Sequence, residues 1–330
     1  MSAKTLTEFG LVLYPGAQVS VVSGLTDLLV IANRFVLSDD EESAKEVRVS
    51  HWQATCPDSP PERIFDTHPE REGMPMVLVL PSVLGDPGGH ALDDSTVAWL
   101  RERHATGTTL GSVCAGAFLL AQTGLLNGRT VTTHWLYAEP FRRQFGQVKL
   151  DVDRLVIDDG DIITAGGAMS WTDLGLKLLD RFLGSRVMLE TSRILLIDPP
   201  GREQRYYSFF SPDMSHGDQA ILKVQHWLHA TAAQDMVLNS MVAITGLEER
   251  TFLRRFRKAT GMTTTEYCQR IRMGRARELL QFGQSSVESI AWEVGYHDVS
   301  AFSRVFTKLL GLTPGEYRHR FGSGRTLSRL

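Results

Sequence analysis

The chain has 330 residues, of which 42% are hydrophobic and 22% are charged. This length is sufficient for two domains, each with its own core, and the composition excludes a disordered or fibrous chain. The start of the chain, MSAKTLTEFG, lacks the charged and then apolar segments of a signal sequence, and no apolar run reaches about 18 residues. We therefore expect a cytoplasmic protein without a membrane partner.

The formal net charge of −3 is distributed unevenly. Residues 216–330 contain 16 basic and 10 acidic side chains, whereas residues 1–215 contain 19 basic and 28 acidic ones. The last third is therefore the part suited to a polyanion such as nucleic acid. Cys56, Cys114 and Cys268 lie far apart without metal-ligand spacing, so we expect no disulfide framework, no metal site and no cofactor.

Strands and helices alternate through the first two thirds of the chain. Short apolar runs end at turn residues, as buried strands do, and longer segments carry apolar residues at helical spacing. This alternation predicts an α/β domain of flavodoxin-like architecture, with a mostly parallel sheet covered by helices on both faces. The expected strands are 9–14, 47–55, 76–80, 109–113 and 129–133, with a hairpin of 155–157 and 161–164; the expected helices are 22–36, 94–105, 116–123, 170–183 and 186–196.

Cys114 stands between the expected strand 109–113 and the expected helix 116–123, in the segment GSVCAGAF. Ligands of such sheets bind beyond the carboxyl ends of the strands, and the small residues around Cys114 suit a sharp, strained strand-to-helix turn. A thiol there would face the amino end of a helix, whose dipole favours the thiolate. The alternative is that Cys114 is only a small apolar residue in a tight turn.

Further ligand-binding residues are expected near the same edge of the sheet. His134 and Trp135 offer a polar group and an aromatic wall, unless they form a core pair. Trp171 and Asp173 combine an aromatic ring with a carboxylate, which suits a cationic amine, although Asp173 is equally suited to cap its own helix. The full predicted ligand set is Asp27, Cys114, Ala115, His134, Trp135, Trp171 and Asp173.

Residues 206–218, YYSFFSPDMSHGD, change from aromatic to polar and contain turn-forming Pro and Gly, so we predict a linker there. It separates a ligand-sensing domain at 7–205 from an all-α domain at 219–321. The helix 220–232 opens this second domain, and residues 322–330 are expected to form a flexible tail.

One pattern is written twice within the second domain, about fifty residues apart. Each copy predicts a helix, a turn that contains Gly and a second helix, which is the order of a helix-turn-helix. The expected helices are 238–244 and 248–260 in the first copy, and 287–294 and 298–310 in the second. The paired positions are Gly246/Gly295, Phe252/Phe302, Arg254/Arg304, Phe256/Phe306, Gly261/Gly311 and Tyr267/Tyr317.

The second helix of each copy has an apolar face and a basic face, because its phenylalanines and its basic residues fall on opposite sides at helical spacing. Arginine both neutralises phosphate and forms a fork of hydrogen bonds to guanine, as insertion into the major groove requires. The alternative is a merely solvated helical bundle, against which two matched copies argue. The predicted base contacts are Arg250, Arg254, Ser300 and Arg304; Lys258 and Lys308 are expected on phosphate, and Val299 completes the set.

A capping box follows each copy, Thr263 with Glu266 and Thr313 with Glu316. The first starts an expected helix 264–282, which would be roughly 28 Å long at about 1.5 Å per residue. One turn of B-DNA rises roughly 34 Å. This helix is therefore long enough to hold the two basic helices in successive major grooves.

Two strings in this domain resemble a known DNA-binding domain. GLEERTFLRRFRKATGMTTTEY and IAWEVGYHDVSAFSRVFTKLLGLTPGEYRHRF are similar to the tandem helix-turn-helix domain of AraC-type transcription regulators. The second string is the more specific, because it keeps the run G-Y…S-x-F-x-R-x-F…G-x-T-P-x-x-Y-R. The resemblance implies promoter DNA as a partner, and RNA polymerase if the protein is an activator, which is the more usual role.

The first domain resembles the PfpI/ThiJ-like superfamily, also called class I glutamine amidotransferase-like, over residues 7–205. The strings that carry this resemblance are LYPGAQ, GSVCAGAFLLAQTGLLNGRTVTTHW, TAGGAMSWTDLGL and LIDPPGREQR. Joined to an AraC-type end, such a domain resembles GlxA-type regulators. That resemblance implies a homodimer whose first domain senses a small metabolite, often a nitrogen compound or quaternary amine.

Enzymes of the resembled superfamily, such as isocyanide hydratase-like proteins, pair the cysteine with a carboxylate after the first strand and often place Thr beside it. Here Val21 stands where the acid would be, Ala115 follows Cys114, and Asp27 is the nearest carboxylate. Without a paired acid or base, nucleophilic chemistry loses its proton acceptor, so we expect a binding fold rather than an enzyme. The alternatives are a Cys114-dependent hydratase or hydrolase and a reversible redox sensor at Cys114.

Overall fold

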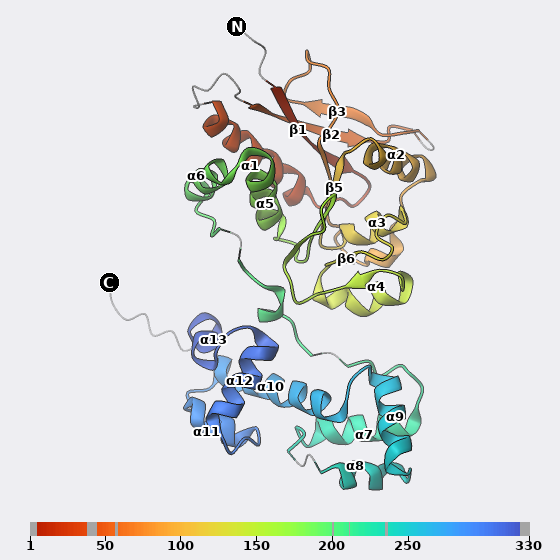
Figure 1. Ribbon diagram of the computed structural model, residues 1–330, viewed down its shortest axis with the longest axis vertical. Coiled ribbons are helices and arrows are strands. Elements are labelled where there is room, and N and C mark those ends of the chain that lie inside the picture. The colour runs from red at the N-terminus through yellow and green to blue at the C-terminus, as the bar shows by residue number, and fades with distance from the viewer. Residues whose placement is uncertain are drawn as a thin grey trace, which may run out of the picture. The chain divides into compact units, whose positions relative to one another are not determined.

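The computed structural model describes residues 5–37, 45–56, 59–199, 201–210, 212–234 and 237–323. The chain divides into two compact units, Met1–Gln204 and Arg205–Leu330 (Figure 1). The first unit is α/β and the second is helical, so the predicted fold class is confirmed. Most of the predicted tail, from residue 324 onward, lies outside the described residues.

A seven-stranded sheet forms the centre of the first unit, in the order β3-β2-β1-β4-β5-β9-β8. Its five inner strands pair in parallel, and the edge strands β3 and β8 pair antiparallel. The inner strands β4 and β5 are buried at every residue, which explains their uninterrupted apolar or small side chains. The strands are β1 (Thr5–Leu13), β2 (Lys45–Gln53), β3 (Glu62–Asp66), β4 (Val77–Leu80), β5 (Thr109–Val113), β8 (Val156–Asp158) and β9 (Ile162–Ala165); β6 (Thr130–Val131) and β7 (Lys149–Leu150) form a separate parallel pair.

Helices cover both faces of this sheet (Figure 1). On one face lie α1 (Val19–Leu37), α5 (Trp171–Leu183) and α6 (Ser185–Leu195); on the other lie α2 (Asp94–Ala105) and α3 (Gly116–Gln122). The predicted hairpin is confirmed as β8 and β9. The expected strand 129–133 shortens to β6. Three elements, β3, β7 and α4 (Ala138–Gln144), were not predicted from the sequence.

Helix α1 is the one described helix that is long and apolar enough to cross a membrane, with a mean hydropathy of 1.5. Its apolar character also has a second explanation, because one side of the helix lies in the core of the first unit. The buried residues of α1 are Val21, Val22, Leu25, Leu28, Leu29, Ala32 and Val36. A core helix and a spanning helix share the same composition, so the helix alone is weak evidence for a membrane.

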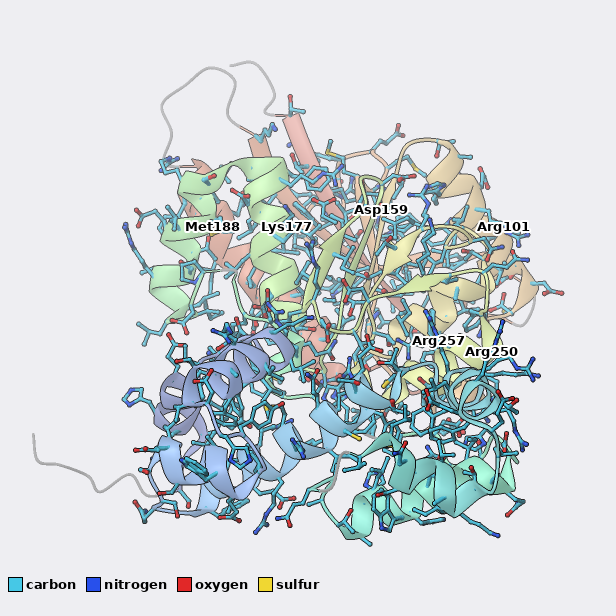
Figure 2. All side chains as sticks on the ribbon, turned by 60° about the horizontal axis from the view of Figure 1, so that its bottom comes forward. Arg101, Asp159, Lys177, Met188, Arg250 and Arg257 are labelled. Atoms are coloured by element: carbon cyan, nitrogen blue, oxygen red, sulfur yellow. The ribbon has the colours of Figure 1, made fainter. Side chains whose placement is uncertain are left out.

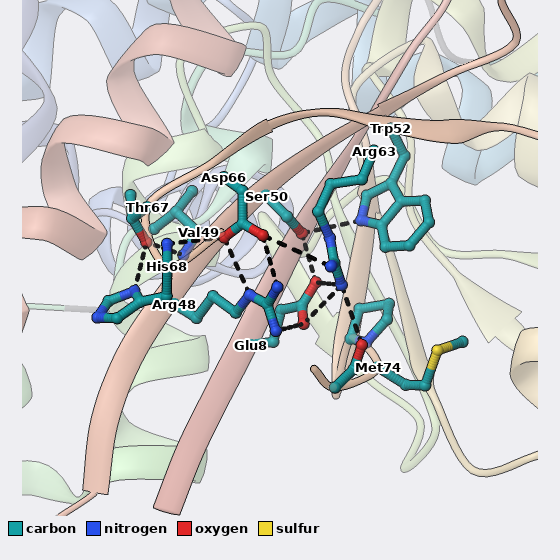
Figure 3. A network of polar contacts seen from close by, with 12 residues as sticks. Glu8, Arg48, Val49, Ser50, Trp52, Arg63, Asp66, Thr67, His68 and Met74 are labelled. Carbon is teal, nitrogen blue, oxygen red and sulfur yellow. Dashed lines mark hydrogen bonds and ion pairs between the residues drawn. The ribbon is translucent and has the colours of Figure 1, made fainter. Parts of the chain in front are cut away.

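Buried ion pairs join β1, β2 and β3 (Figure 3). The fully buried Arg48 of β2 lies 2.5 Å from Oδ2 of Asp66 in β3 and 3.3 Å from Oε2 of Glu8 in β1. Arg63 of β3 contacts the Glu8 carboxylate at 3.0 Å, and Ser50 donates a hydrogen bond to it at 2.6 Å. Two carboxylates thus face two guanidinium groups, which makes the burial of these charges tolerable. The network holds β3 at the edge of the sheet.

The second unit contains two helix-turn-helix copies joined by one long helix. Both capping boxes are formed, and Gly246 and Gly295 occupy the turns with φ of 64° and 81°. The buried apolar side chains form two clusters, one around Phe252 and Phe256 and one around Phe302 and Phe306. The helices are α7 (Gln219–Ala230), α8 (Leu238–Thr245), α9 (Glu249–Thr260), α10 (Thr264–Phe282), α11 (Val287–Glu293), α12 (Val299–Leu310) and α13 (Pro314–Phe321).

The aromatic start of the predicted linker packs against these helices. Tyr207 lies edge-on to the ring of Phe321, with centroids 5.4 Å apart, and accepts a hydrogen bond from Arg320 at 3.0 Å. The Phe210 ring lies 5.1 Å from that of Tyr267. The segment from Tyr206 to Phe210 is therefore part of the second unit.

Candidate nucleic-acid interface and ligand site

The second helix of each copy, α9 and α12, turns its basic face to solvent; we call these two the reading helices. Each holds its place through two buried phenylalanines at spacing four, Phe252 and Phe256 in α9 and Phe302 and Phe306 in α12. The labelled side chains of Arg250 and Arg257 extend from α9 in Figure 2. The core buries the apolar face of each reading helix, so the opposite face is exposed.

The structure exposes six of the seven predicted DNA contacts. Arg304 is 74% exposed and lies 3.9 Å from Asp298, a separation that gives only a weak ion pair. Val299 differs, because it is half-buried and packs against the second cluster. The exposed six are Arg250, Arg254, Lys258, Ser300, Arg304 and Lys308.

Another arginine of α9 has a positioning role inside the second unit. Arg255 donates to both carboxylate oxygens of Asp218, at 2.9 and 2.7 Å. Asp218 also caps α7 by accepting from the Ile221 amide. The hydrogen bond from Arg255 lowers the pKa of Asp218. The pair ties the first reading helix to α7, and the partnership of Arg255 with Asp218 was not predicted from the sequence.

In the first unit, Cys114 occupies the turn between β5 and α3 with a φ of 52°, a left-handed conformation that is costly for any residue other than Gly. The Cys114 amide donates to Ala165 O at 2.7 Å, and the Thr133 hydroxyl donates to Cys114 O at 2.7 Å. A Cβ at Gly116 would approach Pro81 O to 2.4 Å, so this turn also requires the small residue that follows it. The predicted sharp turn is present.

Burial raises the pKa of the Cys114 thiol, although the Ser82 hydroxyl and the Ala115 amide act in the opposite direction. The cysteine is only 3% exposed. Desolvation therefore outweighs the effect expected from the amino end of α3, and the neutral thiol is favoured. Val21, at the position of the expected acid, is fully buried in the apolar core and offers no proton acceptor.

Comparison with known proteins matches both units. The DJ-1/PfpI family model matches residues 72–181, and a helix-turn-helix domain model matches residues 241–320. The chain is 29% identical to the HTH-type transcriptional regulator GlxA of Rhizobium meliloti, over 77% of this chain and 78% of that protein. It is 26% identical to two regulators of Pseudomonas aeruginosa, CdhR, over 69% of this chain and 68% of that one, and ArgR, over 68% of each.

The chain joins a DJ-1/PfpI domain to an AraC-type helix-turn-helix domain.

In the DJ-1/PfpI domain the two predicted carboxylates lie in different surroundings. Asp27 is exposed on the outer side of α1. Asp173 is buried, and Arg202 donates to both of its oxygens, from Nε at 3.2 Å and from Nη2. The Asp173 charge is thus already balanced by a cation of the protein. Trp171 packs across α1 at Gly24, where a Cβ would meet the indole ring at 2.5 Å.

His134 and Trp135 begin the short turn after β6, and both are partly buried. The His134 ring lies 5.4 Å from the Trp135 ring and 5.7 Å from the Tyr137 ring. Burial lowers the pKa of His134, so its neutral form is favoured. Ala115 is fully buried and donates its amide to Ser82 Oγ at 3.3 Å.

Gln204 was not predicted as a site residue, yet it is connected through Thr133 to the turn at Cys114. Its side chain is 2% exposed; Nε2 donates to Thr133 O at 3.0 Å, and Oε1 accepts from the Trp135 amide at 2.9 Å. Thr133 in turn donates to Cys114 O. A Cβ at Gly166 would reach the Gln204 amide at 2.5 Å. In the sequence Gln204 stands within the string GREQR, which has no local pattern that predicts these contacts.

Two cavities lie in the first unit. One, of about 290 Å³, is mostly apolar and lies at the carboxyl ends of β1 and β2, beside Tyr14, Val22 and Gln53. The other, of about 430 Å³, is lined by charged residues that include Asp173 and Arg202. Cys114, His134 and Trp171 line neither, so the predicted ligand set is not gathered around one of these cavities.

Proposed function

We propose that the chain is a sequence-specific DNA-binding transcription regulator whose two reading helices enter successive major grooves. The observation that supports this most strongly is the matched pair of exposed basic faces on α9 and α12, joined by one continuous helix. The 19 residues of α10 span roughly 28 Å, which is close to one turn of B-DNA. The proposal also includes a homodimer in the cytoplasm and, for an activator, contact with RNA polymerase.

Within this proposal the reading helices divide the work between bases and backbone. Arg250, Arg254, Ser300 and Arg304 contact bases, and the lysines Lys258 and Lys308 neutralise phosphate. Base contacts discriminate between sequences, whereas phosphate contacts carry the salt dependence. The two kinds of residue are therefore separable by experiment.

The test starts from duplexes that the full-length chain selects from a randomised pool. Each reading helix is expected to contact its own short stretch of base pairs, which we call a DNA box. Arg254→Ala and Arg304→Ala should each weaken binding to a selected duplex by roughly 5- to 150-fold, or about 1–3 kcal/mol, and relax the base preference at one DNA box. Arg143→Ala, an exposed arginine of α4, is the matched control. No enrichment from the pool and no salt-sensitive binding would refute the regulator; unchanged footprints with both variants would refute the assigned contacts.

A small metabolite bound in the DJ-1/PfpI domain is proposed to control DNA binding, which it can do only by binding one arrangement of the protein better than another. A cationic nitrogen compound, such as a quaternary amine, suits the indole ring of Trp171, because aromatic faces attract cations. A cation at Asp173 would have to displace Arg202 from the carboxylate. A thermal-shift screen with nitrogen-containing metabolites tests this, because a ligand raises the unfolding temperature of the domain that binds it.

A second candidate is a Cys114-dependent hydratase or hydrolase, which the strained backbone at Cys114 favours. The raised pKa of the thiol and the apolar Val21 weigh against it. Incubation with isocyanides or amides, followed by mass spectrometry of the products, separates the two candidates. Turnover that disappears in Cys114→Ala would establish the enzyme.

A further inference from the structure

A buried arginine of α10 lies between the two helix-turn-helix copies. Arg272 is 7% exposed, and each of its three guanidinium nitrogens donates to a backbone carbonyl. Nε lies 2.8 Å from Ala233 O, Nη2 lies 2.8 Å from Gln234 O, and Nη1 lies 3.1 Å from Gly295 O. The guanidinium is thus held in one orientation by three directional bonds.

These three carbonyls come from two segments that are distant in sequence. Ala233 and Gln234 lie in the connection that leaves α7, where Ala232 and Ala233 adopt left-handed φ values of 49° and 51°. Gly295 is the turn between α11 and the reading helix α12. Arg272 therefore links the backbone just before the first copy, where Ala233 packs in the cluster of that copy, to the turn that sets the direction of the second reading helix.

The contacts around Arg272 reinforce this joint. The Gln234 side chain donates to Glu293 O at 3.4 Å, and Arg275 lies 3.3 Å from the Glu293 carboxylate. The buried apolar residues, by contrast, form one cluster for each copy. These polar contacts add to the connection that α10 and the aromatic segment 206–210 make between the copies, and their geometry is directional where apolar packing is not.

The two turn glycines differ in a way that the repeat in the sequence does not reveal. Both are left-handed, but a Cβ at Gly295 would lie 3.0 Å from the Arg272 guanidinium carbon, whereas a Cβ at Gly246 would meet nothing within 4 Å. Gly295 is thus required by its φ and by the approach of Arg272. Gly246 is required by its φ alone.

We propose that Arg272 is a positioning residue that fixes α12 relative to the first copy, and so sets the spacing between the two DNA boxes that the chain accepts. This rests on the proposed function, in which both reading helices contact DNA. Arginine suits the task because its planar fork offers several donors in fixed directions, whereas lysine offers a single flexible ammonium. Arg272 itself is buried and does not contact DNA.

The experiment measures how much affinity is lost when the spacing between the two DNA boxes is changed. A general loss of protein stability would not change this dependence on spacing selectively. Full-length wild type selects its duplex from a randomised pool, and two base pairs are then inserted between the boxes, which turns the second box by roughly 70°. Wild type should lose about tenfold or more in affinity on insertion, equivalent to about 1.4 kcal/mol. Arg272→Gln and Arg272→Lys should reduce this penalty to less than about threefold, while affinity for a single box stays within about twofold of wild type.

An unchanged insertion penalty in folded Arg272→Gln overturns the proposal. If the arginine variants fail to fold, Gly295→Ala and Gly246→Ala decide: both carry the left-handed strain, but only Gly295→Ala should change the insertion penalty. Equal penalties in the two glycine variants overturn the proposal. If wild type enriches no duplex at all, the proposed function itself fails, a result that is distinct from either outcome.

Discussion

Neutralising Glu8 should destabilise the first unit by about 3 kcal/mol. The carboxylate is 2% exposed and faces Arg48, which is fully buried, and Arg63, which is 23% exposed. Glu8→Gln keeps the shape of the side chain but leaves the two guanidinium groups with Asp66 as the remaining carboxylate of the network. Removal of one partner from a buried pair costs about 3–5 kcal/mol, and the lower end applies because Arg63 can still be hydrated.

The double variant Glu8→Gln/Arg48→Met tests the cause. If charge imbalance dominates, the double variant should be more stable than the sum of the single losses predicts, with a coupling energy of about 2–3 kcal/mol. The control is Glu62→Gln, which neutralises an exposed carboxylate of the edge strand β3 and should change stability by less than about 0.5 kcal/mol.

Hydrogen exchange in urea, followed by mass spectrometry of peptides from β1 to β3, is the suitable assay. The chain has two units and 6 tryptophans, so a single fluorescence transition would mix their signals. Additive losses in the double variant, or a Glu8→Gln variant as stable as Glu62→Gln, would show that the network is not held together by charge balance.

Two further predictions concern titration. Hydrogen bonds from Arg129 hold the pKa of Asp161 well below its usual range, so the carboxylate stabilises the folded state above about pH 4 and this contribution is lost as the pH falls further. Asp161→Asn should therefore cost about 1 kcal/mol at pH 7, a value reduced for its 47% exposed side chain. This cost should shrink steadily as the pH falls below about 4 towards the lowered folded-state pKa; a denaturation series that shows a constant difference contradicts this. Among the thiols, iodoacetamide at pH 8 should modify exposed Cys56 first, because burial raises the pKa of Cys114 and raises that of Cys268 to about 11. If peptide mapping finds Cys114 modified first, the thiol in the turn between β5 and α3 is activated and the enzyme candidate gains support.

The sequence predicted elements whose pattern is local. The apolar runs of β4 and β5, the 3.6-residue period of α9 and α12 and the capping box at Thr263 each signal their structure within a few residues. Strand β3 was missed because ERIFD carries three charged residues, which strands normally avoid. Its pairing depends on Arg48 and Glu8, which are distant in sequence, so no local pattern reveals it.

The candidate sites follow the same division. The basic residues of each reading helix recur at consecutive helical turns, so their common face can be predicted from the sequence without knowledge of the tertiary structure. By contrast, the partner of Asp173 lies 29 residues away at Arg202. The helix dipole at Cys114 could be anticipated from sequence, but the burial that outweighs it could not, because desolvation depends on the packing of the whole domain.

The anchoring of the chain around residue 204 constrains how sensor and DNA-binding halves could be exchanged between regulators. A chimera cut near residue 241, where the helix-turn-helix match begins, would discard Phe210 from beneath Tyr267 and Phe209 from its 4.2 Å contact with Arg277. A cut before Gln204 would instead remove the buried Gln204 side chain, with its hydrogen bonds to Thr133 and Trp135, from the first unit. The transferable cassette therefore starts at Arg205, and hybrid proteins assembled at that junction should retain both cores.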